Sequence, residues 1–449
     1  MKKMWLAAVA AVFVFPMTLT ASSSADGLPS AEGTLSLTLD EAIELALDEN
    51  PTIKVADEDI RLKEMTKLET TLSLLPEANL TGSYQRTIKK QKMVMNGMEF
   101  EVGIPNNYNG GLTVSLPVFA PALYKSMKLT RTDVELAMET ARQSRQDLVN
   151  QVTKAYFQQM LAQDSYEVLQ KSYAQAEENF RIVEAKYEQG RVSEYDKISA
   201  EVQMRNLRPS VINARNAVEL SMLQLKVLMG ITADVDIAVQ GSLSDYEESM
   251  YAGLMAADSL TLDRNTTLQQ LDLNSQLLKN TLAVQKQSFM PNVALQFNYM
   301  VLSMNDNFDF ASYKWNPYSN VALSVAVPLF KYSNFSTVKK TRLQMGQLAM
   351  NRDYMERQLE MQKTSYLNSM KASAEQVSSN KEAITQAVKG RDIAQTLYDV
   401  GRGTVLELNS AEVALTQSKL TYSQSIFDYL SAKADLDKLV GEDYVPANK

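Results

Sequence analysis

Residues 112–119 read Leu-Thr-Val-Ser-Leu-Pro-Val-Phe, and residues 323–330 read Leu-Ser-Val-Ala-Val-Pro-Leu-Phe. In both stretches large apolar residues alternate with small or polar ones, which is typical of a strand with one apolar face. Each stretch ends in Pro-x-Phe, and Pro328 follows Pro117 by 211 positions. The same pattern at two distant places indicates that the chain contains an internal duplication.

Other segments repeat at nearly the same spacing. The offset is 215 for Asn50/Asn265 and Pro76/Pro291, and 211 for Tyr187-x-x-Gly190-Arg191/Tyr398-x-x-Gly401-Arg402, 200–202/411–413 and 228–230/439–441. The offset changes once, between Pro76 and Pro117, which predicts that the length difference lies in a hairpin loop. The predicted organisation is a first repeat over residues 26–229, a small connector or belt of mixed structure over 230–264, and a second repeat over 265–449.

Each repeat is predicted to contain a helix, two strands, a very long helix, a tight turn and a further helix. Apolar residues recur at alternating steps of four and three over about 122–187 and 334–398, which indicates coiled-coil helices of about 100 Å. In the second long helix Lys363 and Arg391 interrupt this seam. The shorter helices, placed end to end, match each rod: 51–75 with 194–229, and 265–289 with 405–439.

The composition excludes several classes of function. The 449 residues include no histidine and no cysteine, so Ser-His-Asp and Cys-His catalytic sites, imidazole or thiolate metal sites and disulfides cannot form. Carboxylate-only or lysine-based chemistry stays open, but nothing in the composition favours it, and we expect no enzymatic activity and no cofactor. With 45 basic and 53 acidic residues, a net charge of −8, the chain is too acidic for a general nucleic-acid binder.

The first 25 residues are typical of a signal peptide. Lys2 and Lys3 precede an apolar run, and small residues at 23 and 25 favour cleavage after Ala25, with cleavage after Ala21 as the second choice. The alternative is an uncleaved anchor, but the run is shorter than the roughly 20 residues that span a membrane. Cleavage after Ala25 leaves 43 basic and 53 acidic residues, a net charge of −10.

Four strands cannot close a barrel, and open edges in lipid leave backbone groups unpaired. The edges must therefore be paired by other copies, eight strands in a dimer or twelve in a trimer. Aromatic residues cluster between Phe297 and Phe335, which resembles an interfacial girdle. The alternative is a soluble sheet with an aromatic core. Lys89-Lys90-Gln91-Lys92 is expected to form a basic loop at the outer face.

The chain resembles the TolC-like outer-membrane efflux family (outer-membrane factors) over the whole mature length. The matching features are residues 37–42 (Leu-Thr-Leu-Asp-Glu-Ala), Asn50-Pro51, the duplicated Pro-x-Phe junctions and the duplicated Tyr-x-x-Gly turns followed by an acid. The resemblance implies a homotrimer whose 12-stranded barrel lies in the outer membrane of a Gram-negative bacterium and continues as a 12-helix periplasmic barrel. It implies a passive duct for small molecules or proteins, in a tripartite efflux or type I secretion system. Its implied partners are outer-membrane lipid, a periplasmic adaptor, and an inner-membrane pump of the RND or ABC type.

The resemblance also assigns roles to residues. The turns that end the long helices, here called the tips, are expected to contact the adaptor. A gate or latch is expected to hold the periplasmic mouth shut through a bond between Tyr398 and Asp196. Residues here called the junctions are expected to join strands to helices. The arginine that helps to close the mouth in the family is displaced here, because Gly403 stands at its place and Arg402 precedes it. Of the pair of acidic residues that lines the entrance in the family, only Glu407 is kept, since Ser410 replaces the other. The predicted tips are Gly190, Arg191, Val192, Gly401, Arg402, Gly403 and Thr404; the gate residues are Asp196, Tyr398, Arg402 and Glu407; the junctions are Pro117, Phe119, Pro328 and Phe330.

Two other functions compete with the duct. A non-conducting envelope scaffold would explain rods and strands, but it gives no reason for Pro-aromatic junctions at both hairpins. A carboxylate-based hydrolase has neither a cleft-forming fold nor a distinctive acid pair in the sequence.

Overall fold

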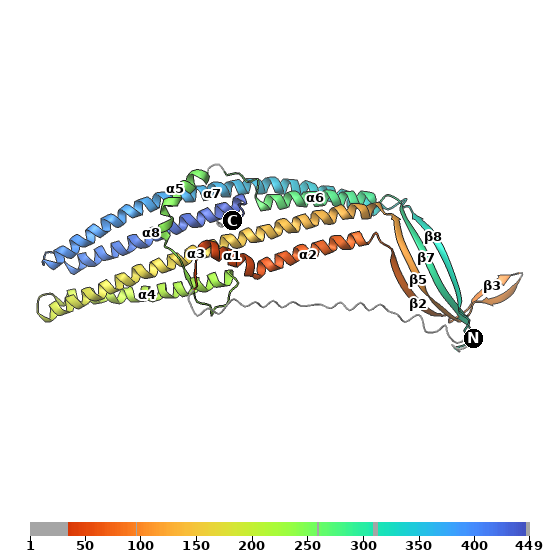
Figure 1. The fold of residues 1–449 in the computed structure, drawn as a ribbon, viewed down its shortest axis with the longest axis horizontal. Helices are drawn as coiled ribbons and strands as arrows, with labels where there is room; N and C mark the ends of the chain where they lie inside the picture. The colour runs from red at the N-terminus through yellow and green to blue at the C-terminus, as the bar shows by residue number, and fades with distance from the viewer. Residues whose placement is uncertain (1–34, 96, 258–259, 309–312, 446–449) are drawn as a thin grey trace.

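The computed structural model describes residues 35–95, 97–257, 260–308 and 313–445, and shows an elongated molecule with a sheet at one end of a helical rod (Figure 1). The predicted signal peptide therefore lies outside the described residues. None of the helices in these ranges is both long and apolar enough to cross a membrane. The helices are α1 (Leu39–Glu49), α2 (Pro51–Leu72), α3 (Pro121–Glu188), α4 (Glu194–Leu228), the 3₁₀ turn η1 (Leu243–Tyr246), α5 (Glu247–Ala257), α6 (Thr266–Gln287), α7 (Tyr332–Asp399) and α8 (Val405–Val440).

The two long helices are the rods that the apolar seams predict. Both α3 and α7 contain 68 residues, which corresponds to about 100 Å at 1.5 Å per residue. Helices α2 and α4 pack along α3, and α6 and α8 pack along α7. The predicted bounds agree with these elements to within about three residues.

The start of the helical region is encoded by local capping. In the Leu-Thr-Leu-Asp-Glu-Ala segment, Thr38 caps α1 and Glu41 bonds back to the Thr38 backbone, which is a capping box. Asn50 then caps α2, with Pro51 at its first position. The motif thus specifies where two successive helices begin.

The repeated asparagines join the short helices end to end. Asn50 Nδ2 donates to Leu228 O at 2.8 Å, and Asn265 Nδ2 donates to Leu439 O at 2.6 Å. Each side chain also accepts a backbone N–H of the helix that it caps, so one residue satisfies groups at the ends of two helices.

The repeated glycines allow the chain to pass close to these joints. Gly230 and Gly441 have φ of +72° and +78°, in the left-handed region that favours glycine. A Cβ added to Gly441 would lie 2.0 Å from Arg264 O, and one added to Gly230 would lie 2.8 Å from Glu49 O. Each repeat therefore uses one Asn and one Gly to form the same structural joint.

The main sheet is antiparallel, with the order β2–β5–β7–β8. Its strands are β2 (Glu77–Arg86), β5 (Asn106–Phe119), β7 (Asn292–Asn305) and β8 (Asn316–Ala326), two from each repeat as predicted. β5 continues beyond Pro117 because β7 pairs with it there, whereas β8 ends at Ala326, two residues before the equivalent Pro328. β2 and β8 are the open edges.

The structure adds four strands that the sequence did not predict. Strands β3 (Gln91–Met95) and β4 (Met98–Val102) form a hairpin that extends beyond the sheet (Figure 1), so the expected basic loop at 89–92 is partly a strand. Strands β1 (Leu35–Leu37) and β6 (Ile237–Val239) pair in parallel and link the start of the chain to the connector. Pairing between distant segments cannot be read from short runs of sequence.

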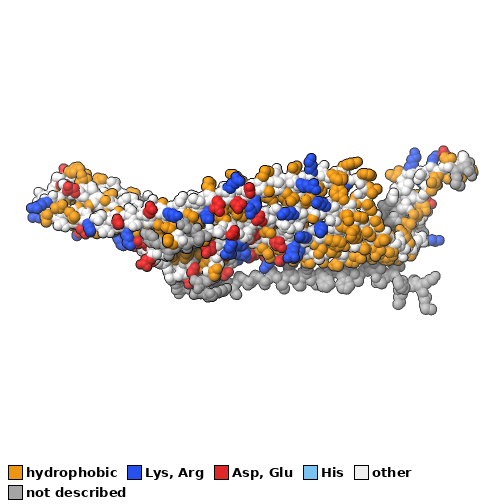
Figure 2. All heavy atoms as spheres, turned by 90° about the horizontal axis from the view of Figure 1, so that it is seen from above, with side chains coloured by type: hydrophobic (Ala, Val, Ile, Leu, Met, Phe, Trp, Pro, Cys, Tyr) orange, Lys and Arg blue, Asp and Glu red, His pale blue; other side chains and the backbone are white. Residues whose placement is uncertain are grey.

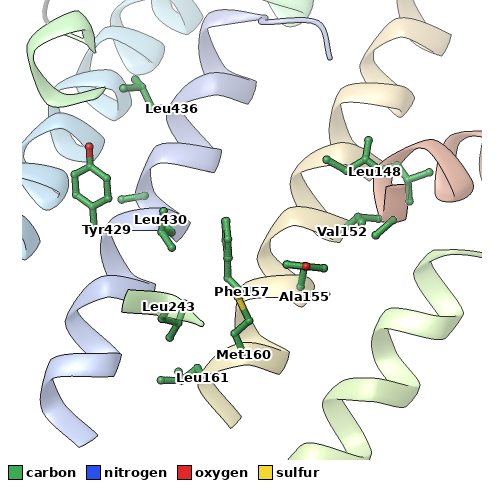
Figure 3. Packing of buried hydrophobic residues seen from close by; sticks show 14 of the residues in the cluster. Leu148, Val152, Ala155, Phe157, Met160, Leu161, Leu243, Tyr429, Leu430 and Leu436 are labelled. Atoms are coloured by element: carbon green, nitrogen blue, oxygen red, sulfur yellow. The ribbon is translucent and has the colours of Figure 1, made fainter. Parts of the chain in front are cut away.

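The main core lies in the middle of the rods, where α1, the connector, α3 and α8 meet (Figure 3). Two buried tyrosines of this core donate hydrogen bonds to other elements. The hydroxyl of Tyr156 donates to Leu37 O at 3.0 Å, and that of Tyr429 donates to Met250 O at 2.5 Å. These bonds connect the connector and the start of the chain to the rods.

The polar residues that interrupt the seams have partners. Gln159 is buried in α3 and accepts a hydrogen bond from Ser221 of α4. On α7, Lys363 Nζ lies 3.8 Å from Glu360 Oε2, and Arg391 Nε lies 3.3 Å from Asp392 Oδ1. Each of these two charges on α7 thus lies within ion-pair distance of a nearby acid.

Candidate functional site

The two tip turns lie together at the end of the molecule farthest from the sheet (Figure 1). Gly190 and Gly401 adopt φ of +69° and +73° and end the two rods. In each turn the next N–H reaches back into the last helical turn: Arg191 N donates to Lys186 O at 2.9 Å, and Arg402 N donates to Leu397 O at 2.8 Å. Both predicted tips therefore have the same backbone.

The second tip is tighter than the first because of Gly403. A Cβ at this position would lie 3.0 Å from Leu397 Cβ and 3.1 Å from Tyr398 N. The equivalent residue in the first tip, Val192, has a side chain that packs partly buried against its surroundings. An arginine at position 403 would press on the end of α7, which is a physical reason for its displacement to Arg402.

A small apolar cluster, here called the tip cluster, joins the two helical hairpins above the turns. It consists of Val183 of α3, Ala200 of α4, Tyr398 of α7, and Val405 and Leu408 of α8. Lys186 Nζ lies 4.2 Å from the centre of the Tyr398 ring, a cation–π contact.

The expected bond between Tyr398 and Asp196 is absent from this structure. Tyr398 is 8% exposed, and its hydroxyl has no hydrogen-bond partner among the described residues. Burial, followed by the charges of Asp196 and Asp399, raises the pKa of Tyr398. Asp196 Oδ2 instead accepts from Ser193 N at 3.1 Å and Ser193 Oγ at 2.7 Å. The carboxylate is thus engaged in capping α4.

Asp196 and Glu407 are equivalent residues of the two repeats, 211 positions apart. Ser193 with Asp196 forms a capping box at the start of α4, and Thr404 with Glu407 forms one at the start of α8. Hydrogen bonds from Thr404 lower the pKa of Glu407, which is exposed. The Ser-x-x-Asp and Thr-x-x-Glu spacings carry this signal, but the sequence analysis missed it.

The arginines of the tips point their charge to solvent. Arg191 and Arg402 are both exposed, and among the residues that the structure describes neither guanidinium forms an ion pair. The end of the rod therefore presents two basic groups beside the acids that cap α4 and α8.

A cavity of about 230 Å³ with both polar and apolar lining residues lies between the hairpins above the tip cluster. It is lined by α3, α4 and α8, and includes Glu412, whose pKa is raised by burial. Arg391 Nε lies 4.0 Å from Glu412 Oε1.

The predicted junction residues lie between the sheet and the rods. Pro117 and Phe119 end β5, immediately before α3, and Pro328 and Phe330 lie between β8 and α7. Phe330 is 84% exposed, so its ring is available to lipid or to another copy.

Known proteins with similar sequences and folds belong to one group. The sequence model described as "Outer membrane efflux protein" matches residues 42–231 and 259–442. Outer membrane protein TolC of Vibrio cholerae is 19% identical over 379 residues, 82% of each chain, and that of Escherichia coli is 21% identical over 412 residues, 87% of this chain and 80% of the relative.

Solved structures show the same fold. The CmeC outer membrane channel of Campylobacter jejuni matches with a TM-score of 0.73 and 15% identity, over 92% of this chain and 87% of CmeC. The open state of the MtrE outer membrane channel of Neisseria gonorrhoeae gives 0.70 and 14%, over 90% and 88%. Because the family model covers most of the chain, in both repeats, this protein belongs to the outer membrane efflux protein family.

Proposed function

We propose that three copies of this chain form a continuous duct across the outer membrane and the periplasm, through which exported molecules pass passively. The observation that carries the proposal is the order of elements, which is the same in every layer. The strands follow β2–β5–β7–β8, the helices next to the sheet follow α2–α3–α6–α7, and those near the tips follow α4–α3–α8–α7. One edge is thus β2, α2 and α4, and the other is β8 and α7.

Both edges carry apolar seams that no other described residue of the same chain covers. Side chains spaced by seven, three or four residues are 50–68% exposed: Val55, Leu62, Met65 and Leu72 on α2, and Leu343, Met350, Tyr354 and Met361 on α7. Figure 2 shows hydrophobic side chains gathered on the part of the rods next to the sheet. Covering eight half-exposed side chains would contribute about 8 kcal/mol per interface. Each α2 edge therefore fits the α7 edge of the next copy.

The two faces of the sheet differ as a barrel wall requires. One face carries Leu80, Leu112, Phe297, Val321 and Leu323, which are all 38–82% exposed. On the opposite face Thr113 Oγ1 donates to Asn298 Oδ1 at 2.9 Å, and Asn298 Nδ2 donates to Asn320 Oδ1 at 3.0 Å. An apolar outer face and a hydrogen-bonding inner face are typical of a membrane barrel.

The aromatic side chains support this orientation at the outer end of the sheet. Tyr84 stacks on Tyr108 with ring centres 4.7 Å apart, and Tyr108 lies 6.4 Å from Trp315. They lie on the apolar face, where a girdle would meet the lipid headgroups. Phe310 of the predicted girdle lies outside the described residues.

The tips are proposed to receive cargo from an inner-membrane pump of the RND or ABC type through a periplasmic adaptor. Their exposed arginines and their position at the far end of the rods support this role. Exchanging Gly401 for proline and Arg402 for glutamate should abolish export while trimers still reach the outer membrane. Normal export by this variant would remove the tips from the mechanism.

Assembly and conductance test the duct directly. The purified protein should have the mass of a trimer by light scattering and give discrete current steps in a planar bilayer. Leu62→Glu with Met65→Glu should prevent trimer formation, whereas Lys67→Glu, on another face of α2, should not. Intact trimers that never conduct would favour the envelope scaffold.

A further inference from the structure

The inner face of the sheet has two chemically different zones. The polar row of Thr113, Asn298 and Asn320 crosses its middle. Farther from the helices, the same face of β7 carries Met300, Leu302 and Met304, at every second position. An apolar stripe therefore lies where the strand alternation otherwise places polar residues.

Gly111, as well as the alternation of side chains along β7, shows that the stripe lies on the inner face of the sheet. Gly111 pairs with Met300 across β5 and β7, and a Cβ added to it would lie 2.5 Å from Met300 Sδ. The Met300 side chain thus lies over Gly111, on the inner face. Tyr318 is opposite Met300 on β8 and is 51% exposed, so it extends the apolar surface sideways.

The surroundings of the stripe are almost uncharged but include an unsatisfied acceptor. On the inner face of the four sheet strands the one charged residue is Glu77, at the end next to the helices. Asn107 is opposite Met304, and its Oδ1 is buried without a hydrogen-bond partner. Because this oxygen is buried, the apolar side chains of the stripe and not this amide oxygen are available for contact on this part of the face.

We infer that this stripe, defined by Met300, Leu302 and Met304, is a binding subsite for the apolar part of amphipathic organic molecules that leave through the barrel. The inference rests on the proposed duct, which makes this face the lumen and places three such stripes around it. Methionine side chains are flexible and polarisable, so they fit apolar groups of varied shape.

Two small amines separate apolar contact from charge. Tributylammonium and trimethylammonium each carry one positive charge and one N–H, but differ by nine methylene groups. Added to the side of a planar bilayer that faces the β3–β4 hairpins, tributylammonium should interrupt the single-channel current for much longer than trimethylammonium. In the Met300→Gln, Met304→Gln variant its dwell time should fall about tenfold, the loss expected from uncovering roughly two methylene groups.

A matched control keeps the fold and the inner surface. Asn79→Gln lies on the same face, beside Thr113 of the polar row and away from the stripe, and it keeps its amide, so it should leave both dwell times unchanged. The dwell time of trimethylammonium should be the same in the wild type and in both variants.

The outcomes separate the subsite from the duct. Normal open currents with an unchanged tributylammonium dwell time in the double variant would overturn the subsite alone. A larger open current of the double variant without any amine would also overturn the subsite. It would mean that part of the chain itself covers the stripe in the wild type and is released by the substitutions. Absence of current from the wild-type trimer would overturn the duct and the subsite together.

Discussion

Tyr398→Phe and Asp196→Asn should act in opposite directions on the tips. In the structure the Tyr398 hydroxyl is buried without a partner, so its removal should stabilise the packed tip by about 1 kcal/mol or more. Asp196 caps α4 through Ser193, and replacing its charge should weaken the start of that helix by about 0.5–1 kcal/mol. A latch bond between the two side chains predicts instead that both variants loosen the tip.

Single-channel conductance of the trimer and its thermal unfolding would measure these effects. Tyr398→Phe should keep or reduce the current step and raise the unfolding temperature, while Asp196→Asn should lower that temperature. Tyr187→Phe is the matched control, because Tyr187 is the equivalent residue of the first repeat and is 37% exposed. If Tyr398→Phe enlarges the current and lowers the unfolding temperature, the hydroxyl has a partner in the assembled protein and the reasoning from the single chain is refuted.

Three further changes test other parts of the structure. Gly441→Ala should lower thermal stability strongly, since its Cβ would lie 2.0 Å from Arg264 O at positive φ. Gly346→Ala, in open space on α7, should leave thermal stability unchanged or raise it. Equal melting temperatures of the two variants would exclude the tight joint. Glu407→Gln preserves the capping box with Thr404 but removes a charge from the mouth, so the reversal potential in a salt gradient should show weaker cation selectivity; an unchanged potential would place the charge away from the path. Burial raises the pKa of Asp437 from 3.8 to about 6, so its ionisation destabilises the native state as pH rises through this window; Asp437→Asn should therefore be more stable than wild type at pH 8, by up to about 3 kcal/mol, and equal to it near pH 3, and a constant difference across pH would contradict this.

Much of the architecture follows from local signals. The four-three spacing of apolar residues along 122–187 predicts one long helix because each side chain reaches only neighbours three and four positions away. Strand alternation around residues 112–116 and 321–327 is likewise local, and the structure confirms these strands as β5 and β8.

The candidate site was predicted only in outline. The sequence located both tip turns, because Gly190 and Gly401 end helices at equivalent positions, and the structure gives both the left-handed conformation. The Ser193–Asp196 bond is a local capping box that the spacing signals, but the sequence could not show that Tyr398 is left without a partner, since this depends on how two hairpins pack. The adaptor and gate roles of these residues remain predictions.

The sequence by itself determined the duplication, the rods and the positions of the turns, because periodicity, capping and repeat offsets are properties of neighbouring residues. Only the tertiary structure decided which edges remain open, why Asn50, Asn265, Gly230 and Gly441 recur, and where the β3–β4 hairpin and the methionine stripe lie. These features come from contacts between segments that are far apart in the chain. Their energies depend on three-dimensional packing, which no local pattern encodes.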